Sequence, residues 1–259
     1  MCIVEVLLKA FVRFKDDCVD KFVLTDLESA GIKVKDEADM ADCDIVIAVG
    51  GDGTILRLAM PAAKAGKPLL GINTGRLGFM AAIERNEAEL RSKLRRLVSG
   101  DYAVSRRMMH CVEFESGERF HALNDVVLRR VAKALPDISV LRNGVEVMSV
   151  RGDGMIVSTA TGSTAYSLSA GGPIVEPELE CFVVTALSPH TLSNRPMVFG
   201  SEAGLQLCSE FMEVCIDGMD AGRCGKVTVT KSEYSFDLIN IGGNCFYNAI
   251  RNKLGFRGS

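Results

Sequence analysis

The stretch Gly50–Thr54 (GGDGT) places one carboxylate among three glycines, directly after the apolar run Ile45–Val49. Glycines allow backbone N–H groups to approach phosphate oxygens, and the N-terminus of a following helix favours an anion. A carboxylate repels a phosphate, so Asp52 is suited to act as a base toward a hydroxyl group or as an indirect partner through Mg²⁺. The alternative is a β-turn whose aspartate caps the next helix.

A second glycine-rich loop, Asn73–Phe79 (NTGRLGF), follows the next apolar run, Leu69–Ile72. In an open α/β sheet, ligands bind beyond the carboxyl ends of the strands, so the two loops are expected at the same edge. Asn73 is suited to hydrogen-bond a ribose or an amide, and Phe79 to form an aromatic wall for a flat ring. Taken alone, such a loop more commonly ends in a core phenylalanine.

The longest candidate unit is Gly152–Pro173, in which the strand-like run Met155–Ser158 leads into a dense series of serine and threonine residues. Hydroxyl groups at this density suit the edge of an adenine and a ribose, and Tyr166 offers a stacking surface. The alternative is a junction between a strand and a helix that is rich in capping residues.

Two adjacent polar residues, Asn124 and Asp125, interrupt the strand-like run Ala122–Arg129. Such an interruption marks either the exposed face of a strand or a site at its end. Without the other three units, the pair favours the exposed face.

The elements that must position these residues alternate between strand and helix over the first hundred residues, which predicts a doubly wound, Rossmann-like α/β domain. Continuous apolar runs are typical of parallel strands that are covered on both faces. Pro61 is expected to kink or restart the second helix. The expected strands are Ile3–Leu8, Ile45–Val49 and Leu69–Ile72, and the expected helices are Asp16–Ala30, Ile55–Ala65 and Glu87–Val98.

After Gly100 the pattern changes to short apolar runs separated by turn residues, which predicts a β-rich, sandwich-like second domain. Asn143-Gly144 is a strong hairpin signal between two such runs. Further strands are expected at 181–187, 204–208, 213–217, 226–230 and 235–239. A C-terminal helix near 244–254 is expected to pack back on the first domain. The predicted domains are therefore 1–100, 101–240 and 241–259.

Composition narrows the class of protein. The chain has 259 residues with a net charge of −3, which does not suggest a nucleic-acid-binding surface. Its nine cysteines contain no C-x-x-C pair, and its histidines have no metal-ligand spacing, so reduced thiols are expected rather than disulfides or a zinc cluster. Neither a signal peptide nor a membrane-spanning run is evident. The sequence predicts a cytoplasmic protein that binds neither nucleic acid nor membrane.

Taken together and in this order, the four units resemble those of the NAD kinase family, over about residues 43–220. Weaker support comes from Leu192–Pro196 (LSNRP) and Asp217-Gly218. The resemblance implies transfer of a phosphoryl group from ATP or another donor to the 2′-hydroxyl of the adenosine ribose of NAD, giving NADP. It implies Mg²⁺ or another divalent cation carried by the donor's phosphates rather than by the protein alone. It also implies a homodimer or homotetramer with the site near a subunit interface.

Residue by residue, the resemblance makes Asp52 the catalytic acid/base, and Gly51 and Gly53 the backbone cradle for phosphates. Asn124 and Asp125 correspond to the pair that contacts ribose hydroxyls and adenine. The remaining nucleotide-binding residues are Asn73, Arg76, Phe79, Arg151, Asp153, Thr161, Thr164, Ala165, Tyr166 and Ser169. Among these, Phe79 corresponds to the pocket wall, and Asp153 to a residue that reaches a neighbouring subunit's ligand.

The chain departs from the family pattern at two positions: Asp125 stands where the family usually has glutamate, and Ala160 where it usually has proline. A GGDG sequence alone is shared with phosphofructokinases and with diacylglycerol and sphingoid kinases. Two alternatives therefore remain: a related kinase of a lipid or sugar hydroxyl, and a non-catalytic sensor that binds NAD(P). The hydroxyl-rich segment around Tyr166 speaks against the first, and the presence of Asp52 against the second.

Overall fold

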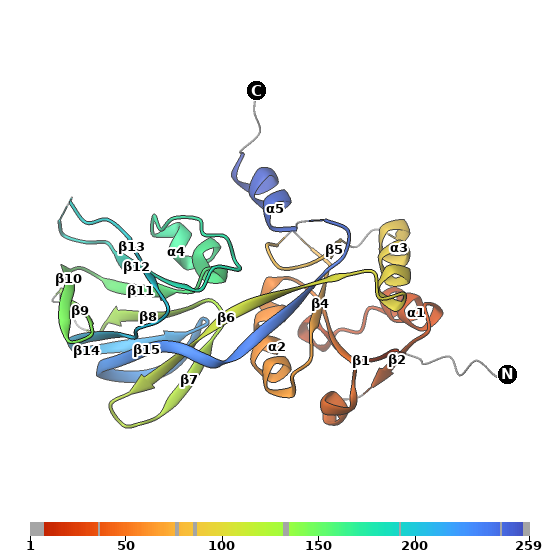
Figure 1. Ribbon diagram of the computed structural model, residues 1–259, viewed down its shortest axis with the longest axis horizontal. Coiled ribbons are helices and arrows are strands. Elements are labelled where there is room, and N and C mark those ends of the chain that lie inside the picture. The colour runs from red at the N-terminus through yellow and green to blue at the C-terminus, as the bar shows by residue number, and fades with distance from the viewer. Residues whose placement is uncertain are drawn as a thin grey trace. The chain divides into compact units, whose positions relative to one another are not determined.

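The computed structural model describes residues 8–35, 37–75, 78–84, 87–131, 135–191, 193–243 and 245–255. The chain divides into two compact units, of which unit 1 comprises residues 1–106 with 236–259 and unit 2 comprises residues 107–235. Both boundaries fall inside strands, namely β6 (Ala103–Phe114) and β15 (Met219–Asn240), which are labelled in Figure 1. Each of these two strands therefore contributes residues to both units.

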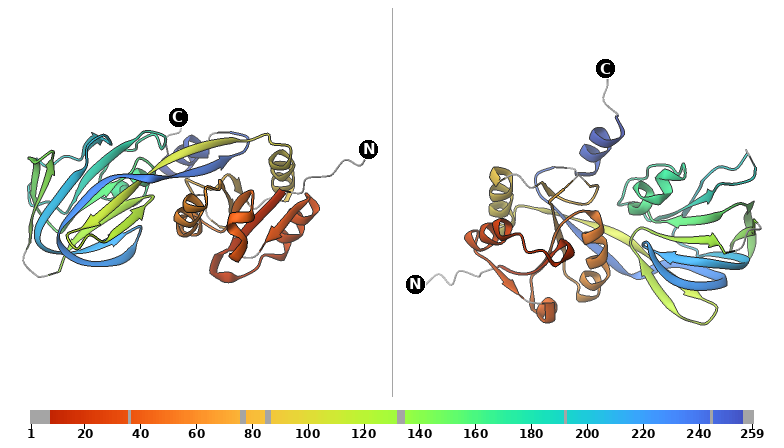
Figure 2. Two further views of the ribbon diagram at one scale, coloured as in Figure 1. Left: turned by 60° about the horizontal axis from the view of Figure 1, so that its bottom comes forward. Right: turned by 180° about the vertical axis from the view of Figure 1, so that it is seen from behind.

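Unit 1 is built on a parallel sheet in the order β2 (Ile32–Lys35), β1 (Leu8–Phe14), β3 (Ile45–Val49), β4 (Leu69–Asn73) and the end of β15. The short strand β5 (Ile83–Glu84) also pairs with β4. Every residue of β3 and β4 is buried, as expected for parallel strands between two layers of helices. Helices α1 (Lys21–Ser29) and α3 (Glu87–Val98) lie on one face and α2 (Asp52–Ala65) on the other (Figure 2). The predicted α/β architecture is confirmed.

Local differences from the predicted elements have simple causes. Helix α1 begins at Lys21 rather than near residue 16, because the Asp20 carboxylate caps it by accepting from the backbone N–H groups of Phe22 and Val23. A 3₁₀ turn, η1 (Lys15–Asp17), precedes it. Helix α2 continues through Pro61 to Ala65, so the predicted restart is wrong. Of the predicted first strand, residues 3–7 lie outside the described part of the chain.

Unit 2 is antiparallel. Its strands pair in the order β13 (Met197–Gly200), β12 (Cys181–Leu187), β11 (Gly154–Ser158), β8 (Asp125–Arg130), β14 (Leu205–Ile216) and β15. Strand β6 lies between β15 and β7 (Arg119–Ala122). The predicted β-rich domain is confirmed, but 226–230 and 235–239 belong to one strand, because residues 231–234 contain neither glycine nor proline to end it.

The predicted Asn143-Gly144 hairpin is present. It joins β9 (Asp137–Arg142) to β10 (Val145–Arg151), with φ angles of 51° at Asn143 and 76° at Gly144. A cluster of buried side chains from β6, β8, β9, β11, β12, β14 and β15 forms the core of this unit. After β11, the chain continues through η3 (Thr161–Thr164) and the single-turn helix α4 (Tyr166–Ser169).

The C-terminal helix α5 (Cys245–Leu254) belongs to unit 1, as predicted. Its Phe246 ring lies 6.4 Å from the ring of Phe79, and the Lys253 Nζ atom lies 4.5 Å from the centre of the same ring. Among the described residues, no helix has the length and apolar character that crossing a membrane requires. Seven cysteines are free thiols, at positions 18, 43, 111, 181, 208, 215 and 224.

Candidate active site

Asp52 is the first residue of α2, and its carboxylate reaches across to the loop that follows β4. Its two oxygens accept hydrogen bonds from the backbone N–H groups of Phe79, at 2.8 Å, and Met80, at 3.3 Å. The two loops predicted from the sequence therefore meet at the carboxyl edge of the sheet. The carboxylate is half-buried and keeps acceptor capacity for a ligand hydroxyl, because an ionised carboxylate has about four lone-pair sites.

Two kinds of glycine surround this carboxylate. A Cβ atom at Gly78 would lie 1.9 Å from the Asp52 Oδ1 atom, so only glycine lets the loop approach the carboxylate this closely. A Cβ atom at Gly51 or Gly53 would meet no described atom within 4 Å. Glycine at Gly51 and Gly53 therefore leaves open space over the first turn of α2, where backbone N–H groups have no partner inside the helix.

A cavity of about 560 Å³ lies in unit 1 beyond the carboxyl ends of β1, β3 and β4, where it is lined by Phe14, Val49 and Thr74. Lys15 and Lys21 also line it, and Lys15 lines a second cavity of about 200 Å³ beside α2. This is the place where open α/β sheets bind ligands. The carboxylates of Asp16 and Asp20 line the cavity as well, but Asp20 already caps α1, and the two ammonium groups suit phosphate. Neither lysine was predicted from the sequence as a candidate, although Lys15 directly follows the last residue of β1.

The other predicted residues of unit 1 have structural partners. Asn73 is buried, and its side chain bonds to the backbone of Gly75, with Oδ1 accepting at 3.1 Å and Nδ2 donating at 3.3 Å. This geometry shapes the turn after β4. The half-buried Phe79 ring contacts α5. Arg76 lies outside the described residues.

In unit 2, the backbone at the predicted pair Asn124-Asp125 is hydrogen-bonded to the side chain of Asp217, which lies in the turn between β14 and β15. The carboxylate of Asp217 accepts the backbone N–H groups of Leu123, Asn124 and Asp125 at 2.7, 2.8 and 3.0 Å. In return, the Asp217 N–H donates to the Asp125 carbonyl at 3.0 Å. Asp217 lies at the turn between β14 and β15 with a φ angle of 49°. The pair is therefore a rigid feature at the start of β8.

Asp125 is buried, so the exposed-face interpretation of this pair is wrong for its second member. Burial raises the pKa of Asp125 to about 7, and the nearby negative charge of Asp217 adds to the shift. Burial also raises the pKa of Asp217, although three N–H donors oppose that shift. Asp125 accepts no side-chain hydrogen bond within the described residues, so it is the member of the pair that holds a proton more readily. Strongly shifted carboxyls of this kind are typical of functional sites.

Several hydroxyls of the segment after β11 belong to the scaffold. Thr159 Oγ1 donates to the Leu123 carbonyl at 2.6 Å and accepts the Gly162 N–H at 3.0 Å. Ser163 Oγ bonds to both backbone groups of Val175, at 3.0 and 3.3 Å. These contacts fix the hydroxyl-rich segment to the chain around it. Part of the high serine and threonine content therefore stabilises the fold and is not available to bind a ligand.

Other groups of the segment remain available to a ligand. The hydroxyls of Thr161 and Ser158 are buried and have no hydrogen-bond partner among the described residues. Such orphaned groups are rare and need an explanation, and a ligand would supply one. Ser158 was not predicted, and it lies opposite Asp125 in the ladder between β11 and β8. The other predicted members, Thr164, Ala165, Tyr166 and Ser169, are half-buried or exposed.

The two remaining predicted residues are Arg151, the last residue of β10, and Asp153, which directly precedes β11. The Asp153 carboxylate pairs with Arg130, with 2.9 Å between Oδ1 and Nε, and both side chains are partly exposed. Arg151 lies 4.0 Å from the Asp137 carboxylate. Asp153 thus has a close charged partner within unit 2, whereas Arg151 is largely exposed and lies at the limit of an ion pair.

A substitution at Gly162 would show how tightly the hydroxyl-rich segment is packed. A Cβ atom at Gly162 would lie 2.0 Å from the Asn124 carbonyl oxygen, and a backbone cannot move away as a side chain can. We expect Gly162→Ala to lower the free energy of unfolding by about 3 kcal/mol, which corresponds to a melting temperature lower by roughly 6–12 °C. The control is Gly200→Ala, whose Cβ atom would meet nothing within 4 Å. Equal melting temperatures for the two variants would contradict the close contact.

Two protein-family models together match most of the chain. Residues 8–102 match the ATP-NAD kinase N-terminal domain, and residues 123–241 match the ATP-NAD kinase C-terminal domain. The chain is 36% identical to the NAD kinase of Alcanivorax borkumensis over 256 residues, covering 93% of this chain and 85% of the relative. It is 35% identical to the NAD kinase of Caldicellulosiruptor saccharolyticus, covering 96% and 94% of the two chains.

Solved structures show the same likeness. The crystal structure of an NAD kinase from Archaeoglobus fulgidus in complex with ATP superposes with a TM-score of 0.81 at 30% identity, over 96% of this chain and all of that one. The yeast NADH kinase complexed with NADH has a TM-score of 0.79 at 21% identity, over 98% of this chain and 89% of that one. At that identity the second likeness concerns the fold alone.

Proposed function

This chain belongs to the NAD kinase family and converts NAD to NADP, and we propose that Asp52 acts as the general base on the 2′-hydroxyl of the adenosine ribose. The observation that carries the proposal is the carboxylate of Asp52, held at the first turn of α2 among glycines that leave the backbone open. A ribose hydroxyl is a poor nucleophile, and a carboxylate within hydrogen-bond reach removes its proton as the phosphoryl group is transferred.

The two backbone donors to Asp52 give it a defined position before any ligand arrives. Hydrogen bonds from Phe79 and Met80 fix both oxygens, so the carboxylate does not have to be ordered when substrate binds. Phosphoryl transfer passes through a loose transition state in which positioning supplies much of the rate enhancement. The glycine at position 78 makes this arrangement sterically possible.

For recognition of the acceptor, we assign the adenosine of NAD to the polar groups of unit 2. Asn124 and Asp125 would contact the ribose hydroxyls and adenine, and the orphaned hydroxyls of Ser158 and Thr161 would find partners in the same ligand. The partly exposed Tyr166 ring offers a stacking surface. The other members of this set are Arg151, Asp153, Thr164, Ala165 and Ser169.

ATP is the donor that the proposal favours, because the family is that of the ATP-NAD kinases and the Archaeoglobus relative was solved with ATP. The donor's phosphates would occupy the open space over Gly51 and Gly53 and the cavity lined by Lys15 and Lys21. A divalent cation such as Mg²⁺ would be held by these phosphates, because they supply the anionic oxygens that Mg²⁺ prefers. A cation bound there would neutralise part of the donor's negative charge.

The contribution of Lys15 to donor binding can be measured directly. We expect Lys15→Ala to raise the KM for ATP by roughly 5- to 10-fold with little change in the KM for NAD, because a partly exposed ammonium–phosphate contact contributes about 1 kcal/mol. The control is Lys64→Ala, which removes an exposed lysine near the other end of α2, away from both cavities. The same KM for ATP in both variants would contradict a role for Lys15.

The decisive test of the function is a screen of donors and acceptors. Purified protein is incubated with NAD or NADH and with ATP, another nucleoside triphosphate or polyphosphate, and the 2′-phosphorylated product is quantified. We expect NADP from ATP and NAD in the presence of Mg²⁺. Binding of NAD without product from any donor would overturn the proposed activity in favour of a sensor.

We further propose that the protein works in the cytoplasm as a homodimer or homotetramer. No described helix could span a membrane, and no feature of the sequence suggests a nucleic-acid partner. Several large apolar side chains of unit 2 are exposed and would be covered in an oligomer, among them Val198, Phe211 and Met219. Analytical ultracentrifugation tests this assignment, and a monomer at micromolar concentration would contradict it.

A further inference from the structure

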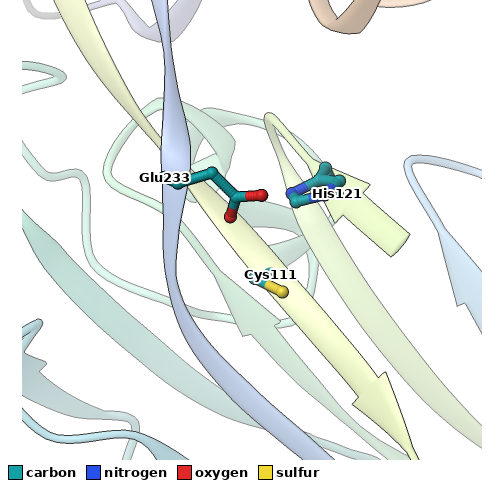
Figure 3. Close-up of side chains that lie close together, drawn as sticks. All are labelled: Cys111, His121 and Glu233. Atoms are coloured by element: carbon teal, nitrogen blue, oxygen red, sulfur yellow. The ribbon is translucent and has the colours of Figure 1, made fainter. Parts of the chain in front are cut away.

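Three neighbouring strands of unit 2 each present one metal-ligating side chain on the same face. Cys111 of β6 lies directly opposite His121 of β7 in the antiparallel ladder, so both side chains leave the sheet on one side. Strand β15 pairs with the other edge of β6 and brings Glu233 to the group. Figure 3 shows the three side chains converging from their strands.

The ligand atoms of this trio are close together, and one of the three residues is exposed to solvent. The Cys111 Sγ atom, a His121 ring nitrogen and a Glu233 carboxylate oxygen all lie within 4.8 Å of one another. The thiol is buried, the imidazole is half-buried and the carboxylate is exposed, so a cation from solvent meets the carboxylate first. None of the three belongs to the residues assigned above to NAD or ATP.

We propose that Cys111, His121 and Glu233 bind a zinc ion in unit 2. Thiolate sulfur, imidazole nitrogen and carboxylate oxygen are the donors that Zn²⁺ prefers, whereas Mg²⁺ and Ca²⁺ select oxygen ligands alone. In a tetrahedral site with bonds of about 2.0–2.3 Å, ligand atoms lie about 3.5 Å apart. The trio needs to close by only about an ångström, and water takes the fourth position.

The charge and the surroundings of the trio support this assignment. Zinc binding would displace the proton of the Cys111 thiol, and the dication would then balance the charges of the thiolate and of the Glu233 carboxylate. Ser232 Oγ lies 2.8 Å from the Nδ1 atom of His121 and also accepts the Tyr234 N–H at 3.0 Å, so the imidazole ring has a neighbour that orients it. Ligating histidines typically have such a partner. The Tyr234 ring packs edge-on against the imidazole at 5.1 Å.

A bound zinc ion would connect β7, β6 and β15 through side chains in addition to the ladder hydrogen bonds. Since the ion binds the folded trio better than the unfolded chain, it would raise the melting temperature of the protein. This role is separate from phosphoryl transfer, which we assign to Asp52 in unit 1. The site is therefore expected to respond to zinc even when no nucleotide is present.

Cobalt is a suitable probe, because Co²⁺ binds to zinc sites and its visible and near-ultraviolet absorption depends on the number and type of its ligands. The full chain, stripped of metal with a chelator, is titrated with Co²⁺ and then with Zn²⁺. We expect one equivalent of Co²⁺ to give a thiolate-to-cobalt charge-transfer band with the intense visible bands of a tetrahedral site, and Zn²⁺ to displace it. Absence of the thiolate band from the wild-type protein would overturn the proposal, whatever the variants do.

The variants identify the ligands. Cys111→Ser is expected to abolish the thiolate band, and Glu233→Gln to weaken Co²⁺ binding at least 10-fold. Cys208→Ser, which changes a half-buried cysteine on β14, is the matched control and should keep the band. Ser232→Ala should weaken binding by roughly 10- to 100-fold while the band keeps its shape, as for other groups that orient a ligand. A band that survives Cys111→Ser or disappears in Cys208→Ser would contradict the assignment.

Discussion

Asp52→Asn is expected to lower the turnover of NAD by roughly 10²- to 10⁴-fold, the range that a general base contributes. The amide cannot take the proton from the ribose hydroxyl, so the chemical step is lost while the loops that bind phosphates stay in place. The Kd for NAD, measured by calorimetry, should change by less than about 10-fold. Turnover equal to that of the wild-type enzyme would exclude Asp52 as the base.

The structure requires one control for this experiment, because Asp52 also accepts hydrogen bonds from Phe79 and Met80. An asparagine keeps one acceptor oxygen and turns a donor toward the other N–H group, which costs about 1–3 kcal/mol of stability. Melting curves with and without NAD separate this effect from catalysis. Gly78→Ala offers a second route, because its Cβ displaces the carboxylate and should lower kcat with the acid still present.

Asp125→Asn is expected to stabilise the protein at pH 8 and to weaken its binding of NAD. The pKa of Asp125 in the folded protein is about 7, against 3.8 for an exposed carboxyl. Because the folded chain holds this proton more tightly, the wild-type protein loses stability as the pH rises from about 4 to about 7. The asparagine variant does not lose stability in this way. For a pKa difference of about three units, the loss of unfolding free energy in the wild-type protein is about 4 kcal/mol.

The expected result is therefore a difference that grows with pH. Urea unfolding should give similar midpoints for the wild-type protein and Asp125→Asn near pH 4, and a higher midpoint for the variant at pH 8. Asp42→Asn, at an exposed aspartate, should show no such divergence. Affinity for NAD should fall by roughly 10- to 100-fold at pH 8, since a hydrogen bond to a charged group contributes about 1.5–3 kcal/mol. Parallel pH profiles for variant and wild type would contradict the raised pKa.

Much of unit 1 could be predicted because its signals are local. The apolar run Ile45–Val49 and the amphipathic segment Glu87–Val98 coincide with β3 and α3. Five consecutive buried residues in a strand need covering on both faces, and that requirement alone indicates an α/β layer. The turn chemistry of Asn143-Gly144 is equally local, and its hairpin is present.

The parts that escaped prediction depend on contacts between residues far apart in the sequence. No local pattern shows that the Asp52 carboxylate meets the N–H groups of Phe79 and Met80. Nor does any pattern show that Asp217 clamps the chain at Asn124. In both cases a side chain satisfies backbone groups of another loop, which becomes visible only once the strands are paired.

The candidate zinc ligands are a further case in which residues far apart in the sequence meet only in the folded protein. Sequence rules look for ligands a few residues apart in one loop, and by that rule the chain holds no zinc cluster. Cys111, His121 and Glu233 are brought together by the register of a ladder instead, with Glu233 more than a hundred residues away along the chain. A strand register is fixed by burial and turn geometry rather than by the ligands themselves.

Unit 1 is assembled from two stretches of chain with all of unit 2 inserted between them. Leu238 pairs with Leu69 at one edge of its sheet, and Ile239 and Ile241 lie in its core. On the ribosome, the first hundred residues therefore emerge long before the strand that completes their sheet. Unit 2 is therefore expected to finish folding first. Until the last residues are synthesised, one edge strand of unit 1 has no partner, and chaperones are expected to protect it from aggregation.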